Sequence, residues 1–304
     1  MEFALAALVA LAVTPLAAAL ARRTGVVDRP GPLKPQERPV PYLGGVPVLC
    51  GCAIGVAATG RYVLLLPLVL AFALGVVDDI RAVPPRVRFG LELLIGVAAA
   101  VVVPGDPFVK IATAGFVVVL LNAVNLVDGQ DGLAGSLALV AALAGAFLGN
   151  DATPFALALA GGLAGFLVFN RPPARIYLGD GGAYLVGTTL AMIPSLADDG
   201  VTRWSVWFAA PLIVAVPILD TAIAVWRRLR TRRPLFTGDR SHVYDQLVDR
   251  GVSVAASTSI LALGQVVLST LGVVAAGLEP LAALAMTLGV ALVAVVASLR
   301  AGFV

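Results

Sequence analysis

Paired and regularly spaced carboxylates are the residues of this sequence that could do chemistry. Asp78 and Asp79 are adjacent at the end of an apolar run, where two negative charges are costly unless a cation or protons compensate them. The alternative is that Asp79 is solvated while Asp78 caps the helix or pairs with an arginine of the next loop. Taken alone, the pair favours neither interpretation.

Four more polar residues recur at every third position, at the mouth of another apolar run. They are Asn122, Asn125, Asp128 and Asp131. Residues three apart are neighbours on a helix, so the spacing predicts a polar stripe that packing alone does not explain. Gly129 and Gly132 would let the backbone turn sharply or approach a ligand closely. This cluster therefore predicts a binding or catalytic site.

Two further loops carry candidate residues. Asp180 precedes Gly181 and Gly182, which open the next predicted helix, and the free N–H groups at that helix start would favour a phosphate. His242 is the only histidine of the chain and lies beside Arg240 in a polar loop. The basic run before this loop is typical of a topology determinant or of a contact with anionic lipid.

The elements that carry these residues are predicted to be membrane helices. The 304-residue chain is 60% hydrophobic and only 13% charged, where soluble proteins carry about 25% charged residues, and its mean hydropathy is +0.98. A spanning helix needs about 20 apolar residues. About eleven such runs are centred near residues 12, 52, 69, 97, 118, 140, 161, 190, 212, 264 and 289. We therefore expect an all-α polytopic membrane protein, with one integral membrane domain over residues 1–304.

The basic residues predict the orientation of these helices. With eleven spans and an outside N-terminus, all but three of the 21 Lys and Arg residues fall on the inner side. The exceptions are Arg61, Lys110 and Arg203. The positive-inside rule thus favours an outside N-terminus and a cytoplasmic C-terminus, and it places the active site in cytoplasmic loops. Carboxylates with arginines suit Mg²⁺ and phosphates, a combination typical of phosphoryl transfer.

Five stretches of the sequence occur in the order of one membrane enzyme family. They are residues 27–30 with Lys34 and 41–45, Asp78-Asp79 with Arg88, 122–133, 170–180, and 239–242. In them the chain resembles the polyprenyl-phosphate N-acetylhexosamine-1-phosphate transferases of the WecA/MraY type. The resemblance implies a multi-pass enzyme of the bacterial plasma membrane. It would transfer a sugar 1-phosphate from a UDP-sugar to undecaprenyl or decaprenyl phosphate, releasing UMP, as the first membrane step of a cell-wall or surface-glycan pathway.

The same resemblance implies roles for particular residues. Asp180, with Asp128, would bind Mg²⁺ or, alternatively, Mn²⁺, and the catalytic carboxylates would be Asp78, Asp79, Asp128 and Asp131. Asp78 matches the residue expected to activate the lipid phosphate. The nucleotide and sugar would be bound by Lys34, Asn125, Asn170, Tyr177, Arg240 and His242. Whether a carboxylate acts as a base or as a covalent nucleophile is left open.

The chain departs from the family pattern at three places. Gln36 stands where the family commonly has a histidine, and the usual Gly-Asp-Ser-Gly-Ser is Gly-Asp-Gly-Gly-Ala at residues 179–183. The usual His-x-His-His is His-Val-Tyr-Asp at residues 242–245. The missing histidines argue against a MurNAc-pentapeptide transferase and for the WecA-like branch.

The main alternative is a membrane transporter or lipid flippase with a cytoplasmic anion-binding site. Such a protein would place ionisable residues near the middle of the membrane on broken helices, whereas here they lie at helix ends. We expect no nucleic-acid partner. The small-residue run at 161–165 permits close helix packing within one chain or between two, so a homodimer is left open.

Overall fold

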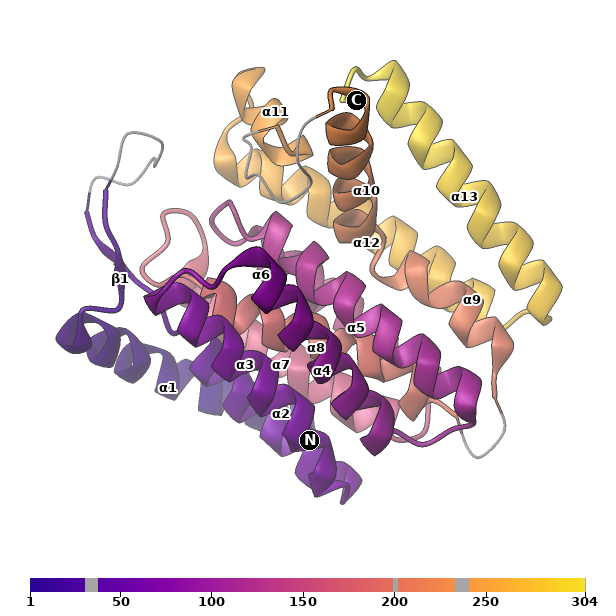
Figure 1. The fold of residues 1–304 in the computed structure, drawn as a ribbon, viewed down its shortest axis with the longest axis horizontal. Helices are drawn as coiled ribbons and strands as arrows, with labels where there is room; N and C mark the ends of the chain where they lie inside the picture. Colours follow the sequence, from indigo (N-terminus) through magenta and orange to yellow (C-terminus); the bar gives the residue numbers. More distant parts are fainter. Residues whose placement is uncertain (31–37, 199–201, 233–240, 304) are drawn as a thin grey trace.

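The computed structural model describes residues 1–30, 38–198, 202–232 and 241–303, whose regular secondary structure is helical apart from one short hairpin (Figure 1). The α-helices are α1 (Glu2–Thr24), α2 (Gly45–Thr59), α3 (Leu65–Ile80), α4 (Pro85–Val102), α5 (Pro107–Val127), α6 (Leu133–Gly145), α7 (Ala152–Asn170), α8 (Gly179–Leu196), α9 (Trp204–Ile213), α10 (Ala215–Arg230), α11 (Val243–Asp249), α12 (Val254–Ala276) and α13 (Pro280–Arg300). Two 3₁₀ turns, η1 (Tyr62–Leu64) and η2 (Ala146–Leu148), adjoin α3 and α6. Strands β1 (Val27–Asp28) and β2 (Val40–Pro41) pair antiparallel, with Val27 opposite Pro41.

The all-α prediction is confirmed for the described residues, and helices occupy each of the apolar runs. Six helical segments are long and apolar enough to cross a membrane, namely α1, η1 with α3, α5, α7, α12 and α13. The bent pair α9 and α10 makes a seventh if it counts as one span, while α2 and α6 are shorter. The protein is therefore a multi-pass membrane protein, and the count of eleven spans stays a prediction. Helix α11, between α10 and α12, was not predicted.

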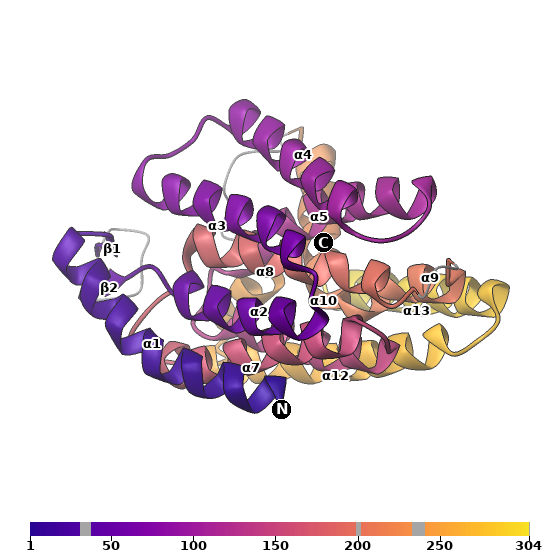
Figure 2. The ribbon, with the colours of Figure 1, turned by 90° about the horizontal axis from the view of Figure 1, so that it is seen from below.

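Helix α8 lies at the centre of the bundle (Figure 2). Every residue of α8 except Asp180 is buried, and α8 packs against α2, α3, α5, α6 and α7. The approach of α3 is so close that a Cβ on Gly75 would overlap the backbone of Asp180. The one polar residue at the start of α8 is thereby held against the end of α3.

The small-residue run of α7 is used inside the chain. Gly161 and Gly165 face α1, where an added Cβ would overlap the carbonyl groups of Phe3 and Ala7, and Gly162 faces Gly51 of α2. Of the two uses that the sequence allowed, close packing within one chain is the one observed.

A bend of 71° separates α9 from α10. Pro217 cannot donate a hydrogen bond to the carbonyl of Ile213, which instead accepts from Gln265 Nε2 at 2.7 Å and from Ser269 Oγ at 2.8 Å. Gln265 Oε1 in turn accepts from the N–H of Val216 at 2.9 Å. Because α12 satisfies the freed backbone groups, the break is tolerated inside the bundle. The bend turns α10 steeply away from α9 (Figure 1).

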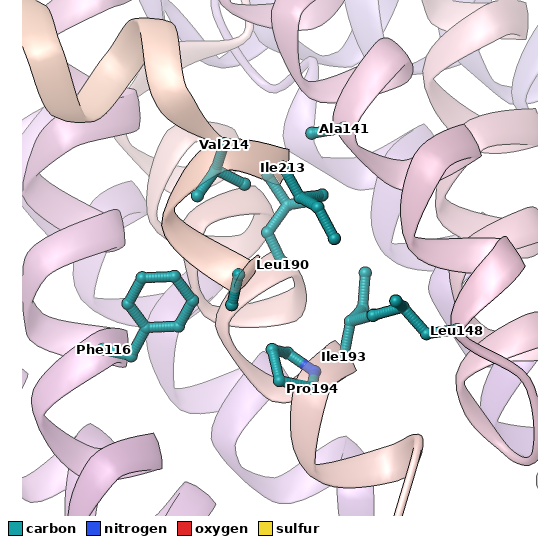
Figure 3. Close-up of a pocket in the computed structure, with 9 residues that line it drawn as sticks. Phe116, Ala141, Leu148, Leu190, Ile193, Pro194, Ile213 and Val214 are labelled. Carbon is teal, nitrogen blue, oxygen red and sulfur yellow. The ribbon is translucent and has the colours of Figure 1, made fainter. Parts of the chain in front are cut away.

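The inner side of this bend encloses a small apolar void (Figure 3). Its volume is about 10 Å³, and its walls include Phe116, Leu190 and Ile213. This is about the volume of one water-sized probe, and a water there would find no set of polar partners. The void is therefore a packing feature and offers nothing to a substrate.

Candidate active site

A cavity of about 850 Å³ opens at the end of the bundle where α3 and α5 end and α8 begins. Eight of the residues predicted from the sequence line it. They are Asp78, Asp79, Asn125, Asp128, Asp131, Asn170, Tyr177 and Asp180. Ligand pockets usually enclose about 300–1,000 Å³. The cavity is large enough for a substrate, and the predicted carboxylates gather in it.

The predicted polar stripe is only partly helical. Helix α5 ends at Val127, and the following residues turn into α6 through Gly132, whose φ of 72° favours glycine. Asn122 does not line the cavity, because its amide donates to Glu92 of α4 at 2.6 Å. The spacing thus correctly predicted that Asn125, Asp128 and Asp131 gather at one site. It did not predict that the Asn122 side chain points toward α4.

Asp79 caps the first turn of α8 from a different helix. Its carboxylate oxygens accept the backbone N–H groups of Asp180 at 3.0 Å and of Gly181 at 3.1 Å. A carboxylate at this place satisfies N–H groups that lack partners within the helix and is favoured by the helix dipole. The prediction that these N–H groups await a phosphate is therefore wrong, since a side chain of the protein already occupies them.

Asp78 is engaged on both oxygens. Oδ1 accepts the N–H of Val83 at 2.7 Å, while Oδ2 accepts from Tyr184 Oη at 2.9 Å and from Arg88 Nη1 at 3.4 Å. The Arg88 guanidinium also lies 3.3 Å from a carboxylate oxygen of Glu92. Asp78 thus closes the turn between α3 and α4 and holds Arg88, as one of the two sequence interpretations expected. The same interpretation left Asp79 solvated, and that part is wrong, because Asp79 caps α8.

Asp128, Asp131 and Asp180 complete the carboxylate cluster. Asp180 Oδ1 accepts from Asn125 Nδ2 at 3.0 Å, and Asp131 Oδ2 accepts the N–H of Ala174 at 2.8 Å. Burial, and then the nearby charges of Asp180, Asp79 and Asp131, raise the pKa of Asp128 well above its ordinary value. Burial also raises the pKa of Asp131. Without a cation to offset their charge, these two carboxyl groups are therefore driven toward their protonated forms.

The carboxylates of the cavity fit a hard divalent cation if a substrate supplies some of its ligands. Within the described ranges, no group of three or more His, Cys, Asp or Glu side chains is arranged to hold a metal. Asp128 and Asp180 nevertheless face the same cavity, and Mg²⁺ is usually bound through one or two carboxylates together with substrate phosphates and water. The crowded charges around Asp128 favour such an ion. The residues therefore fit Mg²⁺ or Mn²⁺ shared with a phosphorylated substrate.

The other wall of the cavity is held by Asn170 and Tyr177. Asn170 is buried, and its amide accepts the N–H of Gly132 at 3.1 Å and donates to the carbonyl of Ile176 at 2.9 Å. Tyr177 is joined to the 41–45 segment by backbone hydrogen bonds to Pro41 and from Gly44, at 2.9 and 3.0 Å. Burial, and then the charge of Asp131, raise the pKa of Tyr177 to about 12. Asn170 therefore ties two loops together, while the Tyr177 ring faces the cavity.

Several lining residues were not predicted as site residues. They include Asp28, Tyr42, Gln130, Tyr244, Asp245 and Ser253. Asp28 and Tyr42 lie in the 27–30 and 41–45 stretches, so the family resemblance was a signal that could have found them. Ser253 follows α11 in a part of the chain that carried no signal.

His242 is placed differently from the prediction. It is buried and does not line the cavity, whereas Tyr244, two residues on, does. Its Nδ1 lies 2.6 Å from Asp220 Oδ2. The other two predicted binding residues, Lys34 and Arg240, lie outside the described residues.

Fold and site define a multi-pass α-helical membrane protein with a carboxylate-lined cavity at one end of its helix bundle. Residues 62–197 of the chain match the model of glycosyl transferase family 4.

Three relatives are similar over most of their length. A protein of Bacillus subtilis (strain 168), named as a probable undecaprenyl-phosphate N-acetylglucosaminyl 1-phosphate transferase, is 29% identical over 86% of this chain and 80% of its own. The undecaprenyl-phosphate alpha-N-acetylglucosaminyl 1-phosphate transferase of Escherichia coli (strain K12) is 27% identical over 84% and 78%. The decaprenyl-phosphate N-acetylglucosaminephosphotransferase of Mycobacterium tuberculosis (strain CDC 1551 / Oshkosh) is 27% identical over 83% and 77%.

Proposed function

We propose that this protein transfers N-acetylglucosamine 1-phosphate, or a closely related N-acetylhexosamine 1-phosphate, from a UDP-sugar to undecaprenyl or decaprenyl phosphate. The observation that carries the proposal is that Asp128 and Asp180 face one cavity of about 850 Å³. The relatives support the choice of substrates, because they are named for this sugar phosphate and for these two lipids.

The reaction exchanges one phosphoanhydride bond for another. An oxygen of the lipid phosphate attacks the β-phosphorus of the UDP-sugar, and the bond from that phosphorus to the oxygen bridging the α-phosphate breaks. The products are the polyprenyl-diphospho-sugar and UMP. A phosphate monoester has a second pKa of about 6, so the lipid phosphate is mostly a dianion at pH 7. Neutralising and positioning charge therefore matters more than a base.

The chain's residues can divide this work. Asp128 and Asp180 would hold Mg²⁺ or Mn²⁺, which when bound supplies positive charge to the phosphate oxygens. Arg88 adds a guanidinium held by Glu92 and by Asp78, which lines the cavity. Asp79 keeps Asp180 in place by capping α8. In this proposal Asp78 positions Arg88 and Asp79 positions Asp180, and neither carboxylate takes a proton from the lipid phosphate.

The nucleotide and sugar would meet the polar and aromatic part of the cavity wall. Asn125 orients Asp180 through its amide, while the rings of Tyr42 and Tyr177, whose centroids are 6.2 Å apart, offer flat faces to a base or a sugar.

We further propose eleven spans, with an outside N-terminus and a cytoplasmic site in the bacterial plasma membrane. In this arrangement the connections at 61 and 151, and those at 106 and 202, lie together on the outer side. Two contacts between these connections support this placement. Arg61 Nε is 2.6 Å from Asp151 Oδ2, and Thr202 Oγ1 donates to Asp106 Oδ2 at 2.6 Å. The cavity lies among the connections of the opposite end, where most basic residues occur.

The proposal is tested with purified protein, undecaprenyl phosphate, Mg²⁺ and a panel of UDP-sugars. UMP should be released with at least one sugar, and Asp128→Asn and Asp180→Asn should lower the rate by at least about 100-fold. Asp198→Asn, a buried carboxylate at the opposite end, is the control and should keep the rate. UMP release that is unaffected in both site variants, or absent with every sugar, would contradict the proposal.

The metal site has a test that does not need activity. Mg²⁺ at saturating concentration should raise the thermal unfolding temperature of the wild-type protein, because a ligand that binds only the folded state stabilises it. Asp128→Asn and Asp180→Asn should remove most of this shift, while Asp198→Asn should keep it. An equal Mg²⁺ shift in all four proteins would exclude these two carboxylates as ligands.

A further inference from the structure

Asp220 fixes the start of α11 from outside that helix. One carboxylate oxygen lies 2.6 Å from His242 Nδ1, and the other accepts the N–H of Val243 at 2.8 Å. Asp220 and His242 are both buried, with 5% and 4% of their side chains exposed. A hydrogen-bonded carboxylate withdrawn from water makes stronger and better oriented bonds than an exposed one. Helix α11 therefore takes its position from α10, beyond the 71° bend.

The contact continues from His242 to the cavity wall. The His242 ring is stacked on the ring of Tyr244, with centroids 5.5 Å apart and planes 3° apart. Tyr244 lines the cavity together with Asp245 and Val248 of the same helix. A shift of His242 would therefore move the ring that forms this wall.

Tyr244 also touches the turn that carries the carboxylates. Its hydroxyl donates to the carbonyl of Leu126 at 3.4 Å, and a Cβ added to Gly129 would overlap that hydroxyl. Helix α11 thus stands directly against the turn that begins at Asp128. Tyr244 and the turn residues Asp128 to Asp131 therefore form one continuous part of the cavity wall.

We infer that Asp220 is a positioning residue that acts through His242 to hold Tyr244 against the Asp128 turn, and that this wall determines the binding of the sugar-nucleotide donor. The inference rests on the proposed function. Helix α11 belongs to the connection between α10 and α12, outside the segments long enough to span. A polyprenyl chain must stay in the bilayer, so a wall built from this connection faces the water-soluble substrate.

The kinetic test compares Asp220→Asn with Asp198→Asn. Asp198 is a matched control, because it is also buried and accepts a backbone N–H at the start of a helix, that of Arg203 at 3.0 Å, but it lies far from α11. Asp220→Asn should raise the KM for the UDP-sugar about tenfold, with kcat and the KM for undecaprenyl phosphate changed less than about twofold. Equal changes in both variants, or a fall in kcat alone, would overturn the inference.

Two further variants test the path through His242. In His242→Asn the amide nitrogen takes the place of Nδ1 and can still donate to Asp220, whereas His242→Ala loses this contact. The KM for the donor should therefore be closer to wild type in His242→Asn than in His242→Ala. If His242→Ala leaves the KM unchanged, Asp220 does not act through this ring.

Amide hydrogen exchange separates this inference from the proposed function. Residues 243–249 should exchange faster in Asp220→Asn than in the wild type, and at the wild-type rate in Asp198→Asn. If the wild type transfers no sugar, the proposed function fails and exchange alone decides whether Asp220 positions α11. Unchanged exchange at 243–249 in Asp220→Asn would reject the positioning role even in an active enzyme.

Discussion

Asp79 accepts the backbone N–H of Asp180 at 3.0 Å, so the second residue of an acidic pair on α3 caps the helix that carries another site carboxylate. The bond links residues 101 positions apart. Two negative side chains are thereby held near each other by a neutral backbone donor. The arrangement makes Asp79 part of the scaffold of the cavity.

Removing this cap should destabilise the protein. Replacing a capping carboxylate by alanine costs about 1 kcal/mol, within about 0.5–2, and Asp79→Ala loses two accepted bonds. We expect a loss of about 2 kcal/mol in the free energy of unfolding, measured by thermal or denaturant unfolding in detergent. Asp79→Asn keeps one acceptor and relieves repulsion with Asp180, so it should cost less. A larger loss in Asp79→Asn than in Asp79→Ala would contradict the capping role.

The contact of α3 with α8 should require glycine at position 75. A Cβ there would overlap the backbone of Asp180, which cannot move without displacing α8. We expect Gly75→Ala to lower the free energy of unfolding by about 3 kcal/mol, at the upper end of typical overpacking costs. Gly90→Ala in α4 is the control, since nothing lies within 4 Å of its added Cβ. A neutral Gly75→Ala would mean that α3 and α8 are packed less closely.

Gly129 and Tyr244 should be energetically coupled. Gly129→Ala places a methyl group on the Tyr244 hydroxyl, so it should destabilise the wild type but be nearly neutral when Tyr244 is already alanine. We expect a coupling energy of about 1–3 kcal/mol from a double-mutant cycle, measured by unfolding in detergent. Additive effects of the two substitutions would show that α11 does not rest on this turn.

Replacing Asn170 should lower the stability of the protein and leave its affinity for the substrate unchanged. Asn170→Ala leaves the N–H of Gly132 and the carbonyl of Ile176 without their partner. A buried polar group that loses its partner costs about 1–3 kcal/mol. We expect a lower unfolding temperature with an unchanged KM for the UDP-sugar in the protein that remains folded. A raised KM at an unchanged unfolding temperature would instead support the direct binding role that the family resemblance implied.

The sequence alone determined the class of the protein and eight of the residues that line the cavity. Long apolar runs form helices in a bilayer because each helix satisfies its own backbone groups, so the position of every run could be read locally. Carboxylates at the ends of such runs must lie near the membrane surface. Asp78, Asp128 and Asp180 were predicted as neighbours for this reason, with the family resemblance naming their roles.

Only the tertiary structure decided what each of these groups does. Asp79 caps α8, Asn122 turns toward Glu92, and His242 pairs with Asp220 behind the cavity wall. Each of these hydrogen bonds joins side chains to partners that are distant in the sequence. A residue's type and spacing limit the bonds that it can make, but the packing of the helices determines which partner lies within about 3 Å. The groups that can bind a metal and a phosphate are those that these hydrogen bonds leave available.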